Sequence, residues 1–185
     1  MTPSGTHVLL LRGINVGGHH RLPMAWLRQT AVKLGGDNAE TYLASGNLIV
    51  TLAPSALVLV FVSGLRAAIA TEHGFEVPIL AVTADAVRSA AASVPFTEQS
   101  LGAPLDPKLC HVAFLDATPT PTAAATLLAR DFDNDQVVID GARCYLWYPD
   151  GSHSSRLTLD RIERDLAVTG TARNLATVRS LAERV

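Results

Sequence analysis

The order of apolar segments in the first half of this 185-residue chain restricts its fold more than any other feature. A short apolar run at residues 7–11 is followed, over residues 23–34, by apolar positions at the three- and four-residue spacing of one helix face. Two further runs, 40–44 and 48–52, flank Ser45-Gly46-Asn47, a composition typical of a tight turn. The pattern therefore predicts a strand, a helix and then a hairpin.

A second helix and a fourth strand complete this half. Pro54 is expected to open a helix that runs to about Glu72. Residues 75–82 follow as a strand, and its Pro78 is typical of a strand at a sheet edge. The order β-α-β-β-α-β is that of the split βαβ, or ferredoxin-like, fold. We predict an α+β protein whose first subdomain, residues 1–96, is ferredoxin-like.

The second half repeats most of this order. Residues 97–107 contain glycine and two prolines with little periodicity, so we interpret them as a connecting segment. The second subdomain, residues 108–185, is predicted to have the related order β-α-β-β-α, with an amphipathic C-terminal helix at about 175–184. Its expected elements are a strand at 109–115, a helix at 120–130, a hairpin from 136–140 and 144–148, and a helix at 159–166.

Composition places the chain among globular proteins, since 48% of its residues are hydrophobic and 17% are charged. A net charge of −2 supplies no general attraction for nucleic acid, so any such binding requires a local patch. Two cysteines are too few for a disulfide scaffold, and the first seven residues do not resemble a secretory signal. We expect a cytoplasmic protein without a membrane partner. The most apolar stretch, 56–62, is too short to span a bilayer and is predicted to be a buried helix.

Strand order predicts where a site lies. In the split βαβ arrangement the strands at 7–11 and 40–44 are parallel and flank a third, so the loops that follow them meet at one edge. Small residues there expose backbone N–H groups, and arginines add charge-assisted donors, which suits an anion. The candidate ligand-binding residues are Arg12, Gly13, Asn15, Gly17, Gly18, Arg21, Ser45, Gly46 and Asn47.

Several interpretations of this edge stay open. The glycines also suit a simple tight turn, and the loop matches neither dinucleotide nor phosphate-loop fingerprints, so no cofactor is predicted. One hypothesis is a binding module for a phosphate, a nucleotide or a nucleic-acid backbone. Another is an enzyme in which Arg12 stabilises negative charge and His19 or His20 acts as acid or base. A third is a homo-oligomer formed through the apolar segment at 57–62.

Other reactive residue types point more to structure than to chemistry. Cys110 and Cys144 lie on predicted strands and are typical of a core, although a metal site with His111 is an alternative. His7 with His19 and His20 is an alternative metal candidate of the same weight, although adjacent histidines in a loop are commonly solvated. The acidic turn at 131–135 lacks the glycine and glutamate of a calcium loop and is predicted to be a solvated turn. We predict no metal site.

The chain resembles a known bacterial family in several separate motifs. They include the run from Leu10 to Gly18, followed by Pro23-Met24, Thr41-Tyr42 and Ser45-Gly46-Asn47. In the second half they include residues 145–151, Ser155-Arg156-Leu157, Thr171-Ala172-Arg173-Asn174 and Thr177-Val178. This pattern resembles the uncharacterised family catalogued as domain of unknown function 1697. The resemblance implies a two-part α+β fold in a cytoplasmic bacterial protein, and no established activity.

A second candidate region lies among the motifs of the second half. The polar segment before the helix at 159–166 suits another anion, although Thr158 as a helix cap is an equally good explanation. The residues of this region are Ser155, Arg156, Arg173, Asn174 and Thr177. Two departures from the family pattern bear on both regions. His19-His20 replace a usual lysine and asparagine, and Leu175-Ala176 replace a usual tryptophan and asparagine.

Overall fold

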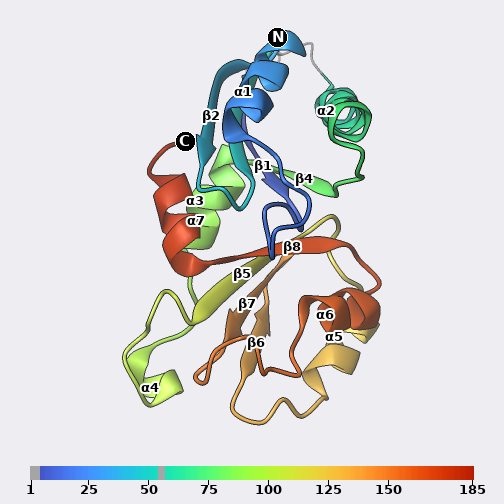
Figure 1. The fold of residues 1–185 in the computed structure, drawn as a ribbon. Helices are drawn as coiled ribbons and strands as arrows, with labels where there is room; N and C mark the ends of the chain where they lie inside the picture. The colour runs from blue at the N-terminus through green and yellow to red at the C-terminus, as the bar shows by residue number, and fades with distance from the viewer. Residues whose placement is uncertain (1–4, 54–56) are drawn as a thin grey trace. The chain divides into compact units, whose positions relative to one another are not determined.

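The computed structural model describes residues 5–53 and 57–185. The chain forms two compact units, and we describe each by itself. The first unit comprises residues 1–88 together with 181–185, and the second comprises residues 89–180. Each contains one four-stranded antiparallel sheet with helices, so the protein is α+β as predicted (Figure 1).

The first unit has the predicted β-α-β-β-α-β order. Its elements are β1 (Gly5–Leu11), α1 (Met24–Lys33), β2 (Asp37–Tyr42), β3 (Asn47–Leu52), α2 (Val58–His73) and β4 (Ile79–Thr83). The strands lie in the order β2-β3-β1-β4, in which β1 pairs antiparallel with both β3 and β4. This is the ferredoxin-like arrangement, and it confirms the predicted fold of the first half.

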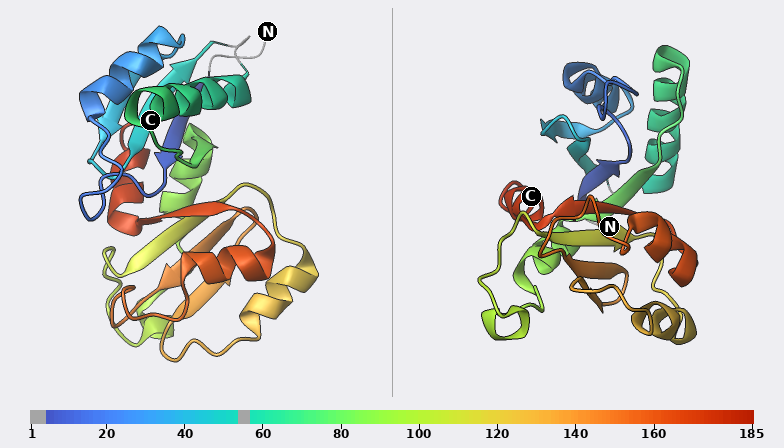
Figure 2. Two further views of the ribbon diagram at one scale, coloured as in Figure 1. Left: turned by 45° about the vertical axis from the view of Figure 1, so that its right-hand side comes forward. Right: turned by 60° about the horizontal axis from the view of Figure 1, so that its bottom comes forward.

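Both helices of the first unit pack on one face of its sheet (Figure 2). Leu9 and Leu11 of β1 share this face because strand side chains alternate, and they meet Leu27 of α1 and Leu65 of α2 in one buried cluster. The prediction that residues 56–62 form a buried helix is wrong for the described residues 57–62: Leu59 is 82% exposed, while Phe61 enters the core. A helix on a sheet buries one face, so an unbroken apolar run leaves the opposite face in solvent. The expected start at Pro54 lies outside the described residues.

The last residues of the chain belong to the first unit. Arg184 Nη1 donates a hydrogen bond of 2.6 Å to Glu40 Oε1, and its guanidinium carbon lies 4.7 Å from the centre of the Tyr42 ring. Arg88 Nε donates to the Val185 carbonyl oxygen at 3.2 Å. An ion pair, a cation–π contact and a hydrogen bond therefore attach the 184–185 segment to β2 and to α3 (Ala84–Ala92).

The second unit has the same strand order as the first. Its elements are β5 (Cys110–Leu115), α5 (Pro121–Leu128), β6 (Gln136–Ile139), β7 (Arg143–Trp147), α6 (Leu159–Leu166) and β8 (Gly170–Asn174). The strands lie in the order β6-β7-β5-β8, and α7 (Leu175–Ala182) follows as the expected C-terminal helix. The predicted β-α-β-β-α order is confirmed, and β8 extends it to β-α-β-β-α-β. The short helix α4 (Glu98–Leu101) was not predicted either.

Helix α6 of the second unit begins with the predicted capping residue. The Thr158 hydroxyl accepts a 3.2 Å hydrogen bond from the Arg161 backbone N–H, which confirms the predicted N-cap. Tyr148 Oη donates at 2.8 Å to the Leu157 carbonyl oxygen and so fixes the segment that enters this helix. Within the described ranges, no helix has the length and apolar character needed to cross a membrane.

Candidate functional site

The segment after β1 folds into a small hairpin. The Asn15 N–H donates to the His20 carbonyl oxygen at 3.1 Å, and the His19 N–H donates to the Val16 carbonyl oxygen at 3.0 Å. Gly17 and Gly18, the two central residues of the turn, have φ values of 58° and 79°. Positive φ at both positions is what a type I′ turn requires, and glycine adopts it at the lowest cost. The glycine-rich stretch is thus a hairpin tip.

Asn15 closes this hairpin and ties it to the β2–β3 turn. Its Nδ2 donates to the carbonyl oxygens of Leu22 and Ala44 at 3.0 and 2.8 Å, and its Oδ1 accepts from the Leu22 N–H at 2.9 Å. Both amide protons and the oxygen are therefore used on backbone groups. Asn15 also has a φ of 55°, a conformation that asparagine tolerates better than most residues.

The β2–β3 turn packs directly against the end of β1. The Leu11 N–H donates to the Gly46 carbonyl oxygen at 2.8 Å. A Cβ on Gly46 would lie 2.8 Å from Leu11 Cβ and 2.9 Å from Ile14 Cδ1, so only glycine fits. Asn47 is fully buried, and its Nδ2 donates to the Tyr42 carbonyl oxygen at 2.8 Å. The two segments meet at one edge, as strand order predicts.

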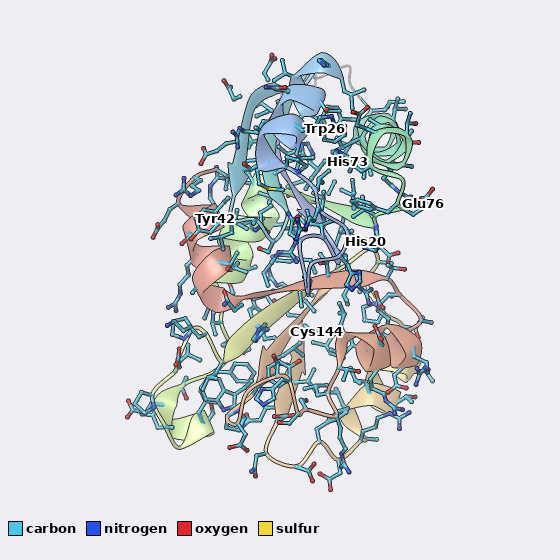
Figure 3. The ribbon with its side chains drawn as sticks, in the orientation of Figure 1. His20, Trp26, Tyr42, His73, Glu76 and Cys144 are labelled. Atoms are coloured by element: carbon cyan, nitrogen blue, oxygen red, sulfur yellow. The ribbon has the colours of Figure 1, made fainter. Side chains whose placement is uncertain are left out.

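An open cavity of about 470 Å³ lies between the hairpin, the β2–β3 turn and the start of α1. It is lined by Asn15, Gly18, Arg21, Leu22, Pro23, Met24 and Ala44. Figure 3 shows the side chains of this region, with Trp26 of α1 and Tyr42 of β2 labelled. No carboxylate occurs among the described residues that line the cavity, and Arg21 is exposed. The cavity is therefore locally cationic.

The N-terminus of α1 reaches this cavity without a side-chain cap. Pro23 occupies the N-cap position, no side chain there accepts a hydrogen bond, and the first turn contains no acidic residue. The first helical hydrogen bond joins the Leu27 N–H to the Pro23 carbonyl oxygen at 3.0 Å, so the N–H groups of Met24, Ala25 and Trp26 precede it. These groups and the helix dipole favour negative charge at this end.

The predicted site residues take different positions at this edge. Asn15, Gly18 and Arg21 line the cavity. Gly13, Gly17, Ser45, Gly46 and Asn47 lie in the two segments that enclose it, and the Ser45 hydroxyl accepts from Asn47 Nδ2 at 3.4 Å. Arg12 donates its backbone N–H to the Pro78 carbonyl oxygen and is not among the lining residues. Leu22, Pro23, Met24 and Ala44 line the cavity and were not predicted; Pro23 without a capping residue before it was the available signal.

His19 and His20, the two histidines of the hairpin, are neighbours in sequence of the lining residues Gly18 and Arg21. Neither histidine lines the cavity itself. The His20 ring stacks on the Phe75 ring at 4.6 Å with an interplanar angle of 17°, and its Nδ1 lies 3.1 Å from the Gly13 carbonyl oxygen. His73 meets the edge of Trp26 at 4.4 Å, and Figure 3 labels both together with His20. His20 therefore fastens the hairpin to the segment before β4.

The second candidate region divides into two groups. In one, Ser155 Oγ donates to Asp135 Oδ2 at 2.5 Å, and Arg156 Nη2 donates to the Asp131 carbonyl oxygen at 3.0 Å. In the other, Asn174 Oδ1 accepts from the Thr177 N–H at 2.9 Å at the start of α7. Arg173, which precedes Asn174 on β8, donates to Thr171 Oγ1, and burial lowers the pKa of its guanidinium to about 10. These side chains hold loops and helix ends in place.

Arg156 also lines a cavity of about 440 Å³ with Arg130 and Arg161. Arg130 forms a two-point ion pair with Asp165, in which Nη2 donates to Oδ1 at 2.8 Å. This hydrogen bond lowers the pKa of Asp165. Arg156 Nε lies 3.4 Å from Asp133 Oδ2. Neighbouring carboxylates thus balance most of the positive charge at this cavity, unlike the cavity at α1.

The two cysteines are buried and do not face each other across the sheet. Cys110 of β5 lies opposite Trp147, whereas Cys144 of β7 lies opposite Ala113. Burial raises the pKa of the Cys110 thiol to about 11 and that of Cys144 to about 12. Among the residues that the structure describes, no group of three or more histidine, cysteine, aspartate or glutamate side chains is placed to hold a metal.

We expect both thiols to be unreactive in the native protein at pH 8, because a thiol with a raised pKa is almost entirely protonated there and these two are also inaccessible. The measurement is labelling with dithionitrobenzoate, which releases one thionitrobenzoate for each thiol that reacts. The control is the protein unfolded in urea, in which both cysteines should react and release two equivalents. Rapid labelling of either thiol in the folded protein would show that its strand opens readily.

Two units of identical strand order, with a hairpin-lined cavity on the first, define a tandem ferredoxin-like α+β protein. The fold resembles that of the conserved bacterial protein SP0830 from Streptococcus pneumoniae, with a TM-score of 0.70 and 21% identity over 97% of this chain and 98% of that chain. Residues 5–145 match the family model described as "Protein of unknown function (DUF1697)", and the chain belongs to this family. The resemblance found in the sequence is thereby confirmed. No curated protein matches the chain.

Proposed function

We propose that this protein is a binding module for an anionic ligand, held in the cavity between the hairpin, the β2–β3 turn and α1. The observation that carries the proposal is the convergence of Arg21 with the uncapped N-terminus of α1 on a cavity lined by no described carboxylate. A guanidinium offers paired N–H donors that match a carboxylate or a phosphate. The N–H groups at a helix N-terminus that have no partner within the helix also attract an anion.

The construction of the edge supports this proposal. The Asn15 side chain forms hydrogen bonds with the backbone of Leu22 and Ala44. These bonds hold the hairpin and the turn at a fixed separation on either side of the cavity. The stacked pair of His20 and Phe75 adds a further attachment. A site whose walls are fixed in advance loses less conformational entropy when a ligand binds. Asn15 and Asn47 therefore support the site as positioning residues in this proposal.

We expect the Arg21→Ala variant to bind inorganic phosphate at least tenfold more weakly than the wild-type protein, because it loses the charged donor that lines the cavity. The measurement is an NMR titration that follows the amide signals of Gly18, Met24 and Ala25. Arg28→Ala is the matched control. It also removes one positive charge, but Arg28 lies on α1, is not a lining residue, and its Nη1 already donates to Thr41 Oγ1 at 2.6 Å. Equal affinities for all three proteins would contradict the proposal.

A second candidate function, self-association, is favoured by one observation on α2. Leu57, Leu59 and Val60 are exposed at its N-terminal end, although their side chains are large and apolar. Burying such side chains against a second copy of the chain would remove them from water. Sedimentation equilibrium should then show a dimer in the wild-type protein and a monomer in Leu59→Glu. A monomeric wild-type protein at millimolar concentration would exclude this function.

A further inference from the structure

We infer that the ligand of the α1 cavity is a small organic anion with an apolar body about the size of one ring, and not a nucleic-acid strand. This inference rests on the proposed function and narrows its ligand class. It combines three observations: the carbon-rich lining, the single lining cation and the exposed apolar side chains on the two enclosing segments.

The first observation concerns the walls of the cavity. Pro23, Met24 and Ala44 have hydrocarbon side chains and are exposed or half-buried, whereas Arg21 contributes the charge; Leu22 also lines the cavity but is almost fully buried. An inorganic phosphate would contact Arg21 and the helix N-terminus and leave these hydrocarbon walls in water. A ligand with an apolar body would cover them, and removing apolar surface from water favours binding.

The second observation concerns the number of cations. Nucleic-acid strands are held by several lysines or arginines that each contact a different phosphate. Among the described lining residues of this cavity, Arg21 is the only cation. Arg66 and Arg88 of the same unit are paired with Glu76 and Asp85, respectively. One lining guanidinium suits one anionic group rather than a row of phosphates.

The third observation concerns the two segments that enclose the cavity. Val16 in the hairpin is 65% exposed, and Leu43 in the β2–β3 turn is 52% exposed. Leu43 also has a φ of 58°, which leucine rarely adopts. These two exposed apolar residues belong to the same segments as the lining residues Gly18 and Ala44. The volume of about 470 Å³ falls in the range of small-molecule sites.

Four probes test the inference by the same NMR titration: phenyl phosphate, benzoate, inorganic phosphate and benzamide. Phenyl phosphate and benzoate carry the ring and the charge, inorganic phosphate carries the charge alone, and benzamide carries the ring alone. We expect phenyl phosphate or benzoate to bind at least tenfold more tightly than inorganic phosphate and than benzamide. The comparison of phenyl phosphate with benzoate separates the two anionic groups.

Variants separate the two parts of the ligand. Met24→Ser should weaken binding of phenyl phosphate by a larger factor than binding of inorganic phosphate, because it removes an apolar wall and keeps the helix N-terminus. Arg21→Ala should weaken both. A single-stranded oligonucleotide of twelve residues should show no advantage over phenyl phosphate.

The outcomes distinguish failure of the inference from failure of the proposed function. If phenyl phosphate and benzoate bind no more tightly than inorganic phosphate, the apolar-body inference is wrong while anion binding stands. If benzamide binds as tightly as benzoate, charge is irrelevant and both are wrong. If the oligonucleotide binds far more tightly than every small probe through Gly18 and Met24, the cavity is part of a nucleic-acid surface and the inference is overturned.

Discussion

Replacing Gly46 with alanine is expected to lower the free energy of unfolding of the first unit by about 3 kcal/mol. Two costs add at this position. Its φ of 87° is unfavourable for any residue with a Cβ. The new Cβ would also lie 2.8 Å from Leu11 Cβ and 2.9 Å from Ile14 Cδ1, and both neighbours are core residues that cannot move freely. The β2–β3 turn should therefore shift away from β1.

Native-state hydrogen exchange of the β1 and β3 amides measures this loss, because these strands lie in the core of the first unit. Gly18→Ala is the matched control. Gly18 has a similar φ of 79°, but no heavy atom of the described residues, apart from its own and its chain neighbours', lies within 4 Å of the Cβ position, so only the backbone cost of about 1 kcal/mol is expected. Equal losses for the two variants would show that the contact with Leu11 and Ile14 contributes nothing.

Replacing Asn15 with alanine should destabilise the first unit by about 3 kcal/mol and weaken anion binding at least tenfold. Three hydrogen bonds to Leu22 and Ala44 are lost together, and the N–H of Leu22, a buried residue, loses its acceptor. Without these hydrogen bonds the hairpin and the β2–β3 turn no longer hold the cavity at a fixed width. Hydrogen exchange at Leu22 and the phosphate titration described above measure the two effects.

Asn15→Gly separates the hydrogen bonds from the backbone conformation. Glycine accepts the φ of 55° as readily as asparagine does, so its loss of stability reports the hydrogen bonds alone. We expect the glycine variant to recover less than half of the loss caused by alanine. If glycine restored stability and phosphate affinity fully, asparagine would be needed only for the turn conformation. The proposal that its side-chain hydrogen bonds hold the hairpin to the β2–β3 turn would then be wrong.

Strand order was the most predictable property of this chain. Periodicity and turn residues in residues 7–83 fixed a β-α-β-β-α-β order, and that order requires the loops after β1 and β2 to lie at one edge. β8 escaped prediction because Gly170–Asn174 contains no apolar run. Its strand conformation comes from pairing with β5, where Thr171 lies opposite Phe114 and Arg173 opposite Val112. Tertiary pairing of this kind leaves no local signal.

The meeting of the two segments at one edge was predictable from the sequence, but the contacts of their side chains were not. Asn15 and Asn47 were selected as ligand donors because of their residue type, yet the structure shows their amides bonded to backbone carbonyls. Which group an amide contacts depends on geometry that residue type does not encode. Met24 and Ala44 gave no chemical signal of a site, since hydrocarbon side chains look the same in a sequence whether they line a cavity or fill a core.

The attachment of residues 184–185 to the first unit has a consequence for folding during synthesis. N-terminal units commonly fold while the ribosome is still making the rest of the chain. Here the partners of Glu40 and Arg88 are Arg184 and Val185, which are made after the whole second unit. The nascent first unit must therefore expose this part of its surface until residues 184–185 have been made. The first unit therefore gains these contacts only after residues 89–180 have been made, which couples its maturation to synthesis of the second unit.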